Sequence, residues 1–486
     1  MTYTSTRGNS KPVSAAEAIL KGIADDGGLY APLEIPKFTL PLNKLTDMKY
    51  TDLAFEVLKL WFTDFTDDEL RYCIEAAYSK GFDNELVAPV IHAGESYFLE
   101  LFHGQTLAFK DMALSILPHL LVTAKNKLGE QRKTVILTAT SGDTGKAALS
   151  GFANVGGTEV IVFYPKGGVS EVQRLQMVTQ EGENAHVISV DGNFDDAQTG
   201  VKNIFNDADF NRELNDKGVI LSSANSINIG RLVPQIVYYF YAYGQMLKNG
   251  AIEDGEWLGF SVPTGNFGNI LAAWYACEMG LPIGNLICAS NENNVLTDFF
   301  NSHEYNTNRK FILTSSPSMD ILVSSNLERL LFETSGQDSA MICDLYDNLR
   351  TKGVFDGFET GLDESGITAG YATEEEVNFA IKLMCDKGYV MDTHTAVAYA
   401  VCQKLCSGGK NVIVSTASPY KFGASVLEAI TGNNHADFSP DALFADLHAA
   451  SGVEIPSVIK DISRLPVLHK THCKKEELKE AVRNIL

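Results

Sequence analysis

The chain has 486 residues, of which 45% are hydrophobic and 21% charged, a composition typical of a globular protein with two or more domains. Its formal net charge of −22 and pI of about 4.9 provide no overall attraction for phosphate backbones, which argues against nucleic-acid binding. An anionic small substrate would therefore need its own local basic groups.

The eight cysteines are scattered, and none forms a CxxC pair. Cys402 and Cys406 are four residues apart, but no histidine or further cysteine is near them in sequence, so we expect no metal site. Isolated cysteines are typical of a reducing compartment. The first residues show no apolar run that would indicate a signal peptide, and residues 235–247 are too short an apolar stretch to span a bilayer. We therefore expect a cytoplasmic protein that binds neither nucleic acid nor membranes.

Residues 1–95 are predicted to be mostly helical. Ser14 precedes the run AAEAILKGIA, and Glu17 follows three residues later, which is the pattern of a capping box at a helix start. Residues 51–62 and 66–77 show the apolar spacing of two further amphipathic helices.

From about residue 130, short apolar runs alternate with helical patterns. We predict strands at residues 134–139, 159–165, 186–192, 219–223, 259–263, 286–290 and 411–417. The helices between them fall near residues 143–155, 170–182, 197–206, 231–248 and 269–280. Buried β-branched runs that alternate with helices predict a parallel, doubly wound α/β architecture. Residues 304–370 are too irregular to assign.

Lys110 lies between an apolar triplet and Asp111 in the segment HGQTLAFKD (103–111). A lysine held against apolar surface has a lowered pKa, and a neutral amine is what Schiff-base chemistry requires. The alternative is a lysine at the start of an amphipathic helix that keeps its charged end in water. Taken alone, this alternative is the more common situation.

Four loops that follow predicted strands carry glycines and small polar residues, and parallel α/β sheets bind their ligands in such loops. The first, TATSGDTGKAAL (138–149), would expose backbone N–H groups to an anion. It is not a Walker A motif, because Gly142 and Gly145 are only three residues apart and Ala147 replaces the hydroxyl residue. A plain capped turn is the alternative interpretation.

The second loop, VPTGNFGNI (262–270), places Gly265 and Gly268 before a helix, as in a phosphate-binding turn, although glycine turns without ligands are about as common. The third, SSANSINIGR (222–231), ends in Arg231, whose guanidinium suits phosphate or carboxylate. Turn capping with a surface ion pair explains this loop equally well. In the fourth, STASPYKF (415–422), the Thr416 hydroxyl could cap a helix or bind a heterocyclic nitrogen.

Together these loops and Lys110 favour a phosphorylated cofactor bound covalently to the lysine, with a second anionic group nearby. Pyridoxal 5′-phosphate with a phosphorylated substrate fits that combination.

With these motifs the sequence resembles the threonine synthases, in the longer form of this fold-type II pyridoxal-phosphate family. The resemblance runs from YTSTRG (3–8) to STASPYKF and rests on HGQTLAFKD, ATSGDTG, SANSIN followed by Arg231, and GNFGN. It implies two doubly wound, mostly parallel α/β domains, like those of the tryptophan synthase β-subunit, and a helical N-terminal domain. We expect a helical domain at 1–95, a large cofactor-binding domain at 96–130 and 230–435, a smaller inserted domain at 131–229, and a C-terminal extension at 436–486.

The resemblance also implies roles for particular residues. Lys110 would bind the cofactor and move the proton on the substrate's Cα, Asp143 would lie near the pyridine 3-hydroxyl, and Thr416 would meet the pyridine nitrogen. The cofactor phosphate would be held by Gly265, Asn266, Phe267, Gly268 and Asn269. The substrate would be bound by Ser141, Thr144, Asn225, Ser226 and Arg231.

The implied enzyme is a carbon–oxygen lyase that converts O-phospho-L-homoserine and water into L-threonine and phosphate, the last step of threonine biosynthesis. The γ-phosphate would be eliminated first, and water would then add at Cβ. Two alternatives stay open: a related phospho-lyase that releases 2-oxobutyrate, and a non-catalytic nucleotide-binding regulatory protein. The sequence does not distinguish a monomer from a homodimer.

The chain departs from the family pattern at three positions. Gln105 stands where many members have proline, which could loosen the turn before Lys110. Ser418 and Tyr420 replace a histidine and an alanine close to Thr416. None of these changes removes a functional group, so we expect activity to survive. His103 could be an acid or base, but a structural role is the better interpretation, because the lysine amine can do the proton transfer unaided.

Overall fold

The computed structural model describes residues 1–140, 142–406, 408–435 and 438–486. Its larger sheet has six strands in the order β13-β10-β9-β14-β4-β3 and is parallel except where β3 pairs with β4. The strands are β3 (Val90–Ala93), β4 (Ser96–Glu100), β9 (Leu258–Pro263), β10 (Ile283–Ser290), β13 (Ile367–Tyr371) and β14 (Lys410–Ser415). The helices around it are α11 (Ile236–Lys248), α12 (Gly268–Glu278), α13 (Val295–Ser302), α17 (Glu374–Asp386) and α18 (Thr393–Leu405).

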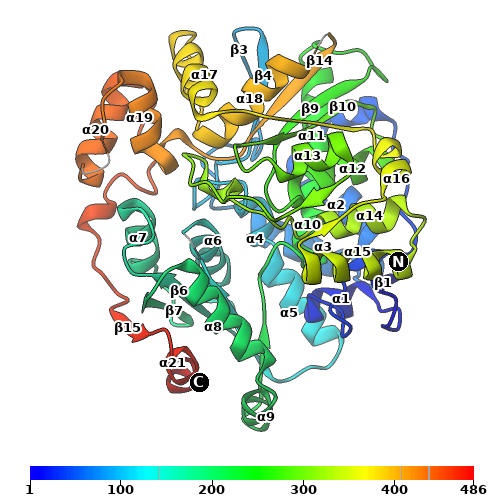
Figure 1. Ribbon diagram of the computed structural model, residues 1–486, viewed down its shortest axis with the longest axis vertical. Coiled ribbons are helices and arrows are strands. Elements are labelled where there is room, and N and C mark those ends of the chain that lie inside the picture. The colour runs from blue at the N-terminus through cyan, green and yellow to red at the C-terminus, as the bar shows by residue number, and fades with distance from the viewer. Residues whose placement is uncertain (141, 407, 436–437) are drawn as a thin grey trace.

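The smaller sheet has five parallel strands in the order β15-β7-β6-β5-β8 and forms the lower left lobe in Figure 1. Its strands are β5 (Lys133–Ala139), β6 (Thr158–Pro165), β7 (Ala185–Asp191), β8 (Val219–Ser222) and β15 (Thr471–Lys474). Its helices are α6 (Asp143–Phe152), α7 (Glu171–Val178), α8 (Phe194–Asn206) and α9 (Ala208–Asp216).

The strands of the smaller sheet are buried on both faces, because successive side chains point to opposite sides of a strand. Ile136, Val160 and Val162 pack into the hydrophobic core that also contains α6. Val135 and Ile161 point the other way, into a second core with α8. Burial on both faces explains the nearly continuous apolar runs of this region. The doubly wound α/β fold class predicted from the sequence is confirmed.

The N-terminal segment is helical as predicted. Ser14 caps its first helix: the Ser14 hydroxyl accepts from the Glu17 N–H, and the Glu17 carboxylate accepts from the Ser14 N–H. The side chains of these helices continue into the core of the larger sheet, so the two parts share one hydrophobic cluster. The elements are β1 (Tyr3–Ser5), α1 (Ala15–Lys21), β2 (Tyr30–Pro32), η1 (Leu42–Asp47), α2 (Tyr50–Trp61) and α3 (Asp67–Tyr78), followed after β4 by α4 (Asp111–Leu114) and α5 (Leu117–Lys127).

The long helix predicted near residues 231–248 is interrupted. Pro234 has no N–H to donate, and a 3-10 turn forms there in place of a continuous α-helix. The segment therefore consists of α10 (Ile229–Leu232), η2 (Val233–Gln235) and α11. This break sets Arg231 on a short helix of its own beside the loop that precedes it.

The segment that the sequence left unassigned contains short elements and one strand of the larger sheet, β13. The others are β11 (Tyr305–Asn306), η3 (Pro317–Met319), α14 (Leu327–Thr334), α15 (Ser339–Lys352), β12 (Val354–Phe355) and α16 (Glu359–Glu364). Two of the strands have only two residues, too few to give a periodic pattern.

The C-terminal segment crosses from the larger sheet to the smaller one, down the left side of Figure 1. Its elements are η4 (Pro419–Phe422), α19 (Gly423–Thr431), α20 (Pro440–Ser451), η5 (Ile462–Arg464), β15 and α21 (Leu478–Ile485). Leu478 and Val482 of α21 are buried in the core of the smaller sheet. The four domain boundaries drawn from the sequence stay a prediction.

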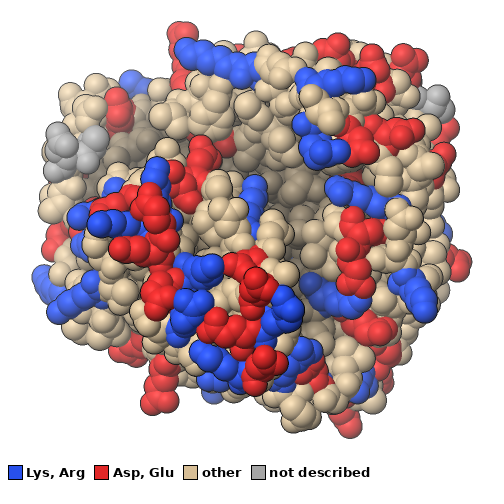
Figure 2. Space-filling view, turned by 60° about the horizontal axis from the view of Figure 1, so that its bottom comes forward, with Lys and Arg blue, Asp and Glu red and all other residues tan. Residues whose placement is uncertain are grey.

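The surface carries both charges. On the face shown in Figure 2, lysine and arginine side chains are interspersed with aspartate and glutamate rather than gathered in a single patch. Within the described ranges, no helix is both long and apolar enough to cross a bilayer.

Candidate active site

Lys110 immediately precedes α4, in a loop that is fixed to the end of β14. The Phe109 N–H donates to the Thr416 carbonyl at 2.8 Å, and the Ser418 N–H donates to the Leu107 carbonyl at 3.0 Å. Leu107 has a φ of 58°, a left-handed conformation that costs energy for a residue with a branched side chain. The surrounding hydrogen bonds hold this strained loop in place, and with it the position of Lys110 beside Thr416.

The Lys110 side chain is largely buried, and its amine faces one carboxylate. Nζ lies 3.5 Å from Oδ2 of Asp143, the first residue of α6. Burial lowers the pKa of Lys110, Asp143 opposes this effect, and Lys421 and Arg231 lower the pKa further. The interpretation of a solvated lysine is therefore wrong for this residue, because its amine is enclosed and biased toward the neutral, nucleophilic form.

The glycine loop between β9 and α12 is a tight turn that leads into a helix N-terminus. Phe267 adopts a φ of 64°, and a Cβ on Gly265 would lie 2.8 Å from the Ser318 carbonyl oxygen, so a larger residue would not fit there. The loop ends at the N-terminus of the eleven-residue helix α12, where the first N–H groups have no partner within the helix and the dipole favours negative charge.

Asn269 lies in the first turn of α12, and its side-chain amide accepts hydrogen bonds at Oδ1 but has a donor at Nδ2 that is unpaired within the described part of the chain. Tyr238 and Tyr239 both donate their hydroxyls to its Oδ1, each at 2.6 Å. Its Nδ2 is buried, and the described residues give it no acceptor. A buried donor without a partner is costly, and a ligand phosphate would satisfy it. This loop therefore fits the cofactor phosphate.

Arg231 is a second buried donor group at the site. Its Nη1 donates to the Ala224 carbonyl at 2.7 Å, while its buried Nε has no partner in the described part of the chain. Burial lowers the pKa of this guanidinium to about 10. No carboxylate of the described residues forms an ion pair with it, which leaves a positive charge facing the cavity. A buried cation of this kind fits an anionic ligand.

These groups line one cavity of about 320 Å³. Of the predicted site residues, it brings together Lys110, Thr144, Asn225, Ser226, Arg231, Gly265, Asn266, Phe267, Gly268, Asn269 and Thr416. The Phe267 ring itself is buried and stacks on Phe300, with ring centroids 6.1 Å apart. Asp143 lies behind Lys110, within reach of its amine. Ser141 is outside the described residues.

Several polar residues at this site were not predicted. Ser318 Oγ donates to Asp143 Oδ2 at 2.8 Å, and its N–H donates to His394 Nε2 at 3.2 Å. His394 Nδ1 lies 2.8 Å from Oδ2 of Asp392, a contact that holds the ring with Nε2 toward Ser318. The sequence offered one signal, the run of polar residues Asp392, Thr393, His394 and Thr395. In the structure Asp392 caps helix α18, and all four side chains are buried.

His103 does not line the cavity. Its Nδ1 lies 2.6 Å from Asp83 and its Nε2 lies 2.9 Å from Glu100. Although burial lowers the pKa of His103, its hydrogen bonds to these two carboxylates raise it to about 9. These contacts agree with a structural role between two acidic side chains.

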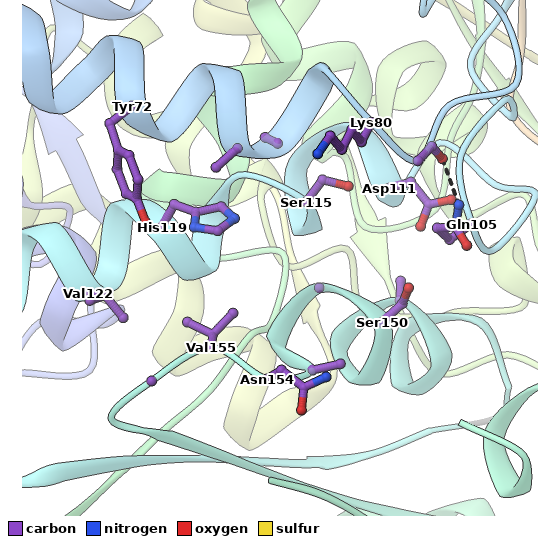
Figure 3. Close-up of a pocket in the computed structure, with 17 residues that line it drawn as sticks. Tyr72, Lys80, Gln105, Asp111, Ser115, His119, Val122, Ser150, Asn154 and Val155 are labelled. Carbon is purple, nitrogen blue, oxygen red and sulfur yellow. Dashed lines mark hydrogen bonds between the residues drawn. The ribbon is translucent and has the colours of Figure 1, made fainter. Parts of the chain in front are cut away.

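The three departures from the family pattern are accommodated away from the cavity. Gln105 is exposed, and its Nε2 donates to the Gly81 carbonyl at 3.0 Å, at one end of a separate groove between α3 and α6 (Figure 3). Ser418 is buried and caps η4 by accepting from the Tyr420 N–H at 3.3 Å. The Tyr420 hydroxyl donates to the Val453 carbonyl at 2.6 Å and so fixes the C-terminal segment.

Comparison with known families agrees with this geometry. A family model described as "Pyridoxal-phosphate dependent enzyme" matches residues 91–417, which contain both the lysine and the glycine loop. The fold and the cavity are thus those of a pyridoxal-phosphate-dependent enzyme, and pyridoxal phosphate is its cofactor. A second model, "Threonine synthase N terminus", matches residues 2–78.

The chain belongs to the threonine synthase family. It is 35% identical to threonine synthase of Saccharomyces cerevisiae over 98% of both chains, and 39% identical to that of Pseudomonas aeruginosa over 89% of this chain and 91% of the other. A crystal structure of pyridoxal-phosphate-bound threonine synthase from Brucella melitensis superposes with a TM-score of 0.88 at 36% identity, covering 100% of this chain and 99% of that one.

The chain is also 40% identical to human threonine synthase-like 1, over 85% of its own length. It spans only 58% of that longer relative. Membership of the family therefore leaves the reaction of this particular chain to be argued from its site.

Proposed function

We propose that this protein is a threonine synthase, a lyase that converts O-phospho-L-homoserine and water into L-threonine and phosphate. The observation that carries the proposal is the buried Arg231 guanidinium in the same cavity as Lys110 and the glycine loop. One anion site suffices for the cofactor phosphate. Arg231, a buried cation without a carboxylate partner among the described residues, provides a second anion site. This second site fits a substrate that carries its own phosphate.

Pyridoxal phosphate, when bound, supplies the electron sink that acidifies the C–H bonds of the substrate. Lys110 would hold this cofactor and, once the substrate amine has taken its place, would take the Cα proton at Nζ. Its lowered pKa suits both tasks, because only the neutral amine can attack a carbonyl or accept a proton.

The remaining residues would bind and orient. Asn269 and the first turn of α12 would hold the cofactor phosphate, while Arg231, Asn225 and Ser226 would hold the phosphate of the substrate, both before and after it leaves. Thr416 would present a hydroxyl, not a carboxylate, to the pyridine nitrogen. A hydroxyl leaves that nitrogen largely unprotonated, which moderates the electron sink and disfavours transamination. The released phosphate would be held close enough to help activate the water that adds at Cβ.

The direct test is a spectrum of the purified protein before and after O-phospho-L-homoserine is added, followed by product analysis. We expect an absorbance band at about 410–420 nm that changes with substrate, and threonine and phosphate in equal amounts. Homoserine, which lacks the phosphate, is the matched control and should change the band only weakly. Release of 2-oxobutyrate and ammonia instead would indicate the related phospho-lyase. A protein without the band would favour a nucleotide-binding regulatory protein.

We expect the enzyme to act in the cytoplasm on its small phosphorylated substrate, as a monomer or homodimer.

A further inference from the structure

A buried lysine with no role in the proposed reaction, Lys421, lies next to the Asp143 carboxylate. Its Nζ is 3.2 Å from Oδ1 of Asp143, and its side chain is fully buried. The same Nζ donates to the Thr106 carbonyl at 2.9 Å and to Oε1 of Gln176 at 3.1 Å. An ammonium group has three N–H donors, and three oxygen atoms surround this one.

These three contacts join segments that are far apart in the sequence. Thr106 belongs to the loop before Lys110, Gln176 belongs to α7, and Asp143 begins α6. Lys421 itself follows β14 in the turn η4. Its ammonium group is therefore located where the lysine loop of the larger sheet meets the helices of the smaller one.

The Asp143 carboxylate has a lysine amine beside each oxygen. Lys110 Nζ lies 3.5 Å from Oδ2, and Lys421 Nζ lies 3.2 Å from Oδ1. Gln173 and Ser318 complete the shell with hydrogen bonds of 3.0 Å and 2.8 Å. Burial alone would raise the pKa of Asp143, but the nearby Lys421 and Lys110 hold this pKa well below its usual range. Because the carboxylate is already paired with one cation, it does not depend on Lys110 for its charge balance.

We propose that Lys421 is a positioning residue for Lys110: its buried ammonium group neutralises Asp143, so that the Lys110 amine is free to bind the cofactor and to take a proton. This inference rests on the proposed role of Lys110. Without the second cation, an unbalanced carboxylate in a dry site would favour the charged form of the Lys110 amine beside it.

Other charged or titratable groups surround the pair. Arg231 faces Lys110, and His394, bonded to Asp392, faces Asp143. Asp111 accepts from the Thr106 N–H and hydroxyl. Lys146, on α6, contacts Gln180. Burial lowers the pKa of Lys146 to about 8, yet this lysine does not contact Asp143 in the described structure. Lys146 is therefore a matched control: a half-buried lysine one turn further along α6 that is not bonded to the carboxylate.

The test is the pH at which pyridoxal phosphate binds covalently to the full-length protein. The bound cofactor is fixed by borohydride reduction and located by peptide mass analysis, a readout that does not depend on turnover. Lys421→Met should raise the pH midpoint of attachment by about one unit or more, since a more basic Lys110 is neutral only at higher pH. Asp143→Asn should lower the midpoint, because Lys421 then remains as an unbalanced cation beside Lys110.

The double variant Asp143→Asn/Lys421→Met should return the midpoint to near that of the unaltered protein, because the two changes act in opposite directions. Lys146→Met should leave it unchanged. A Lys421→Met midpoint that does not rise would overturn the proposal, and so would a double variant that keeps the full upward shift.

If Lys421→Met fails to fold, Asp143→Asn decides: its midpoint must fall, and an unchanged or raised midpoint contradicts the proposal. Cofactor attached to a residue other than Lys110 would contradict the proposed function instead, so the two failures are distinguishable.

Discussion

Lys110 and Asp143 follow strands of different sheets, yet Nζ of the lysine lies 3.5 Å from Oδ2 of the aspartate. The lysine comes after β4 of the larger sheet, and the aspartate begins α6 after β5 of the smaller sheet. The environment of the amine therefore depends on how closely α6 packs against α4, the helix that follows Lys110.

Gly151 makes that packing possible. A Cβ on this residue of α6 would lie 2.1 Å from the carbonyl oxygen of Leu114, at the end of α4, and backbone cannot rotate away as a side chain can. Gly151→Ala should lower the free energy of unfolding by about 1–3 kcal/mol and weaken cofactor attachment. Gly156→Ala, at a lining residue of the same groove next to Val155 (Figure 3), has open space around its Cβ and should change neither. Urea unfolding and the cofactor absorbance measure both effects, and equal behaviour of the two variants would contradict this account.

Removal of the Lys110 amine should abolish the absorbance band near about 410–420 nm and all turnover. The fold should survive Lys110→Ala, because Asp143 keeps Lys421 as its ion-pair partner. Lys125 is the matched control: it is also buried, but its Nζ donates to the Gly157 carbonyl, away from the cavity. Lys125→Ala should retain the band. A Lys110→Ala protein that kept chromophore and activity would rule out the assignment.

Arg231 and Arg329 are both buried, but they differ in how many of their guanidinium N–H groups have hydrogen-bond acceptors. Arg329 donates to the Tyr30 and Ile227 carbonyls and to the side chain of Asn326, whereas Nε of Arg231 has no acceptor among the described residues. Arg231→Met should raise KM for O-phospho-L-homoserine by about 100-fold, leave the cofactor bound, and leave the melting temperature unchanged or higher.

Arg329→Met should instead lower the free energy of unfolding by about 3 kcal/mol, since it leaves buried acceptors unpaired. Steady-state kinetics and thermal unfolding separate the two arginines. Loss of cofactor from Arg231→Met would contradict the assignment of this residue to the substrate phosphate.

His103 should make stability depend on pH. Its folded-state pKa of about 9 lies above the value of about 6.5 for an unfolded histidine. The protonated ring therefore stabilises the fold fully below about pH 6.5, and this contribution is lost as the pH rises through 9. The stability difference between the unaltered protein and His103→Gln should shrink by about 2–3 kcal/mol between pH 6 and pH 10. Urea unfolding at both pH values measures it, and a constant difference would refute the charged state of His103.

Gln105 should matter little. Its side chain is exposed and makes one hydrogen bond, to the Gly81 carbonyl. Gln105→Ala should change the free energy of unfolding by less than about 0.5 kcal/mol and leave kcat and KM unchanged. Denaturation and kinetics would reveal any larger effect, which would mean that the departure from proline alters the loop before Lys110.

The strands and the ligand-facing loops could be predicted because their signals are local. A buried parallel strand shows as an apolar run, and the glycine and asparagine turns follow it directly in sequence. Lys110, Arg231 and the 265–269 loop therefore emerged from the sequence, and the structure brings them into one cavity. Their individual roles stay predictions.

The partners of Asp143 could not be predicted in the same way. Ser318 comes from a segment without periodicity, and Gln173 and Lys421 come from helical turns where polar residues are normally solvated. Only the folded chain shows that these side chains are buried and meet at one carboxylate. The break at Pro234 was missed for a different reason: the apolar pattern continues on both sides of it, and the proline rather than the pattern determines the backbone there.

The order of strands in the smaller sheet has a consequence for biosynthesis. β7 is covered on its outer side by β15, whose residues are translated long after β5, β6, β7 and β8 have been made. Until then β7 is an open edge with unpaired N–H and C=O groups, a known starting point for aggregation. Leu478 and Val482 also join the core of this sheet late. The nascent chain would therefore be vulnerable at β7 during synthesis, and chaperones that bind exposed strand edges could act there.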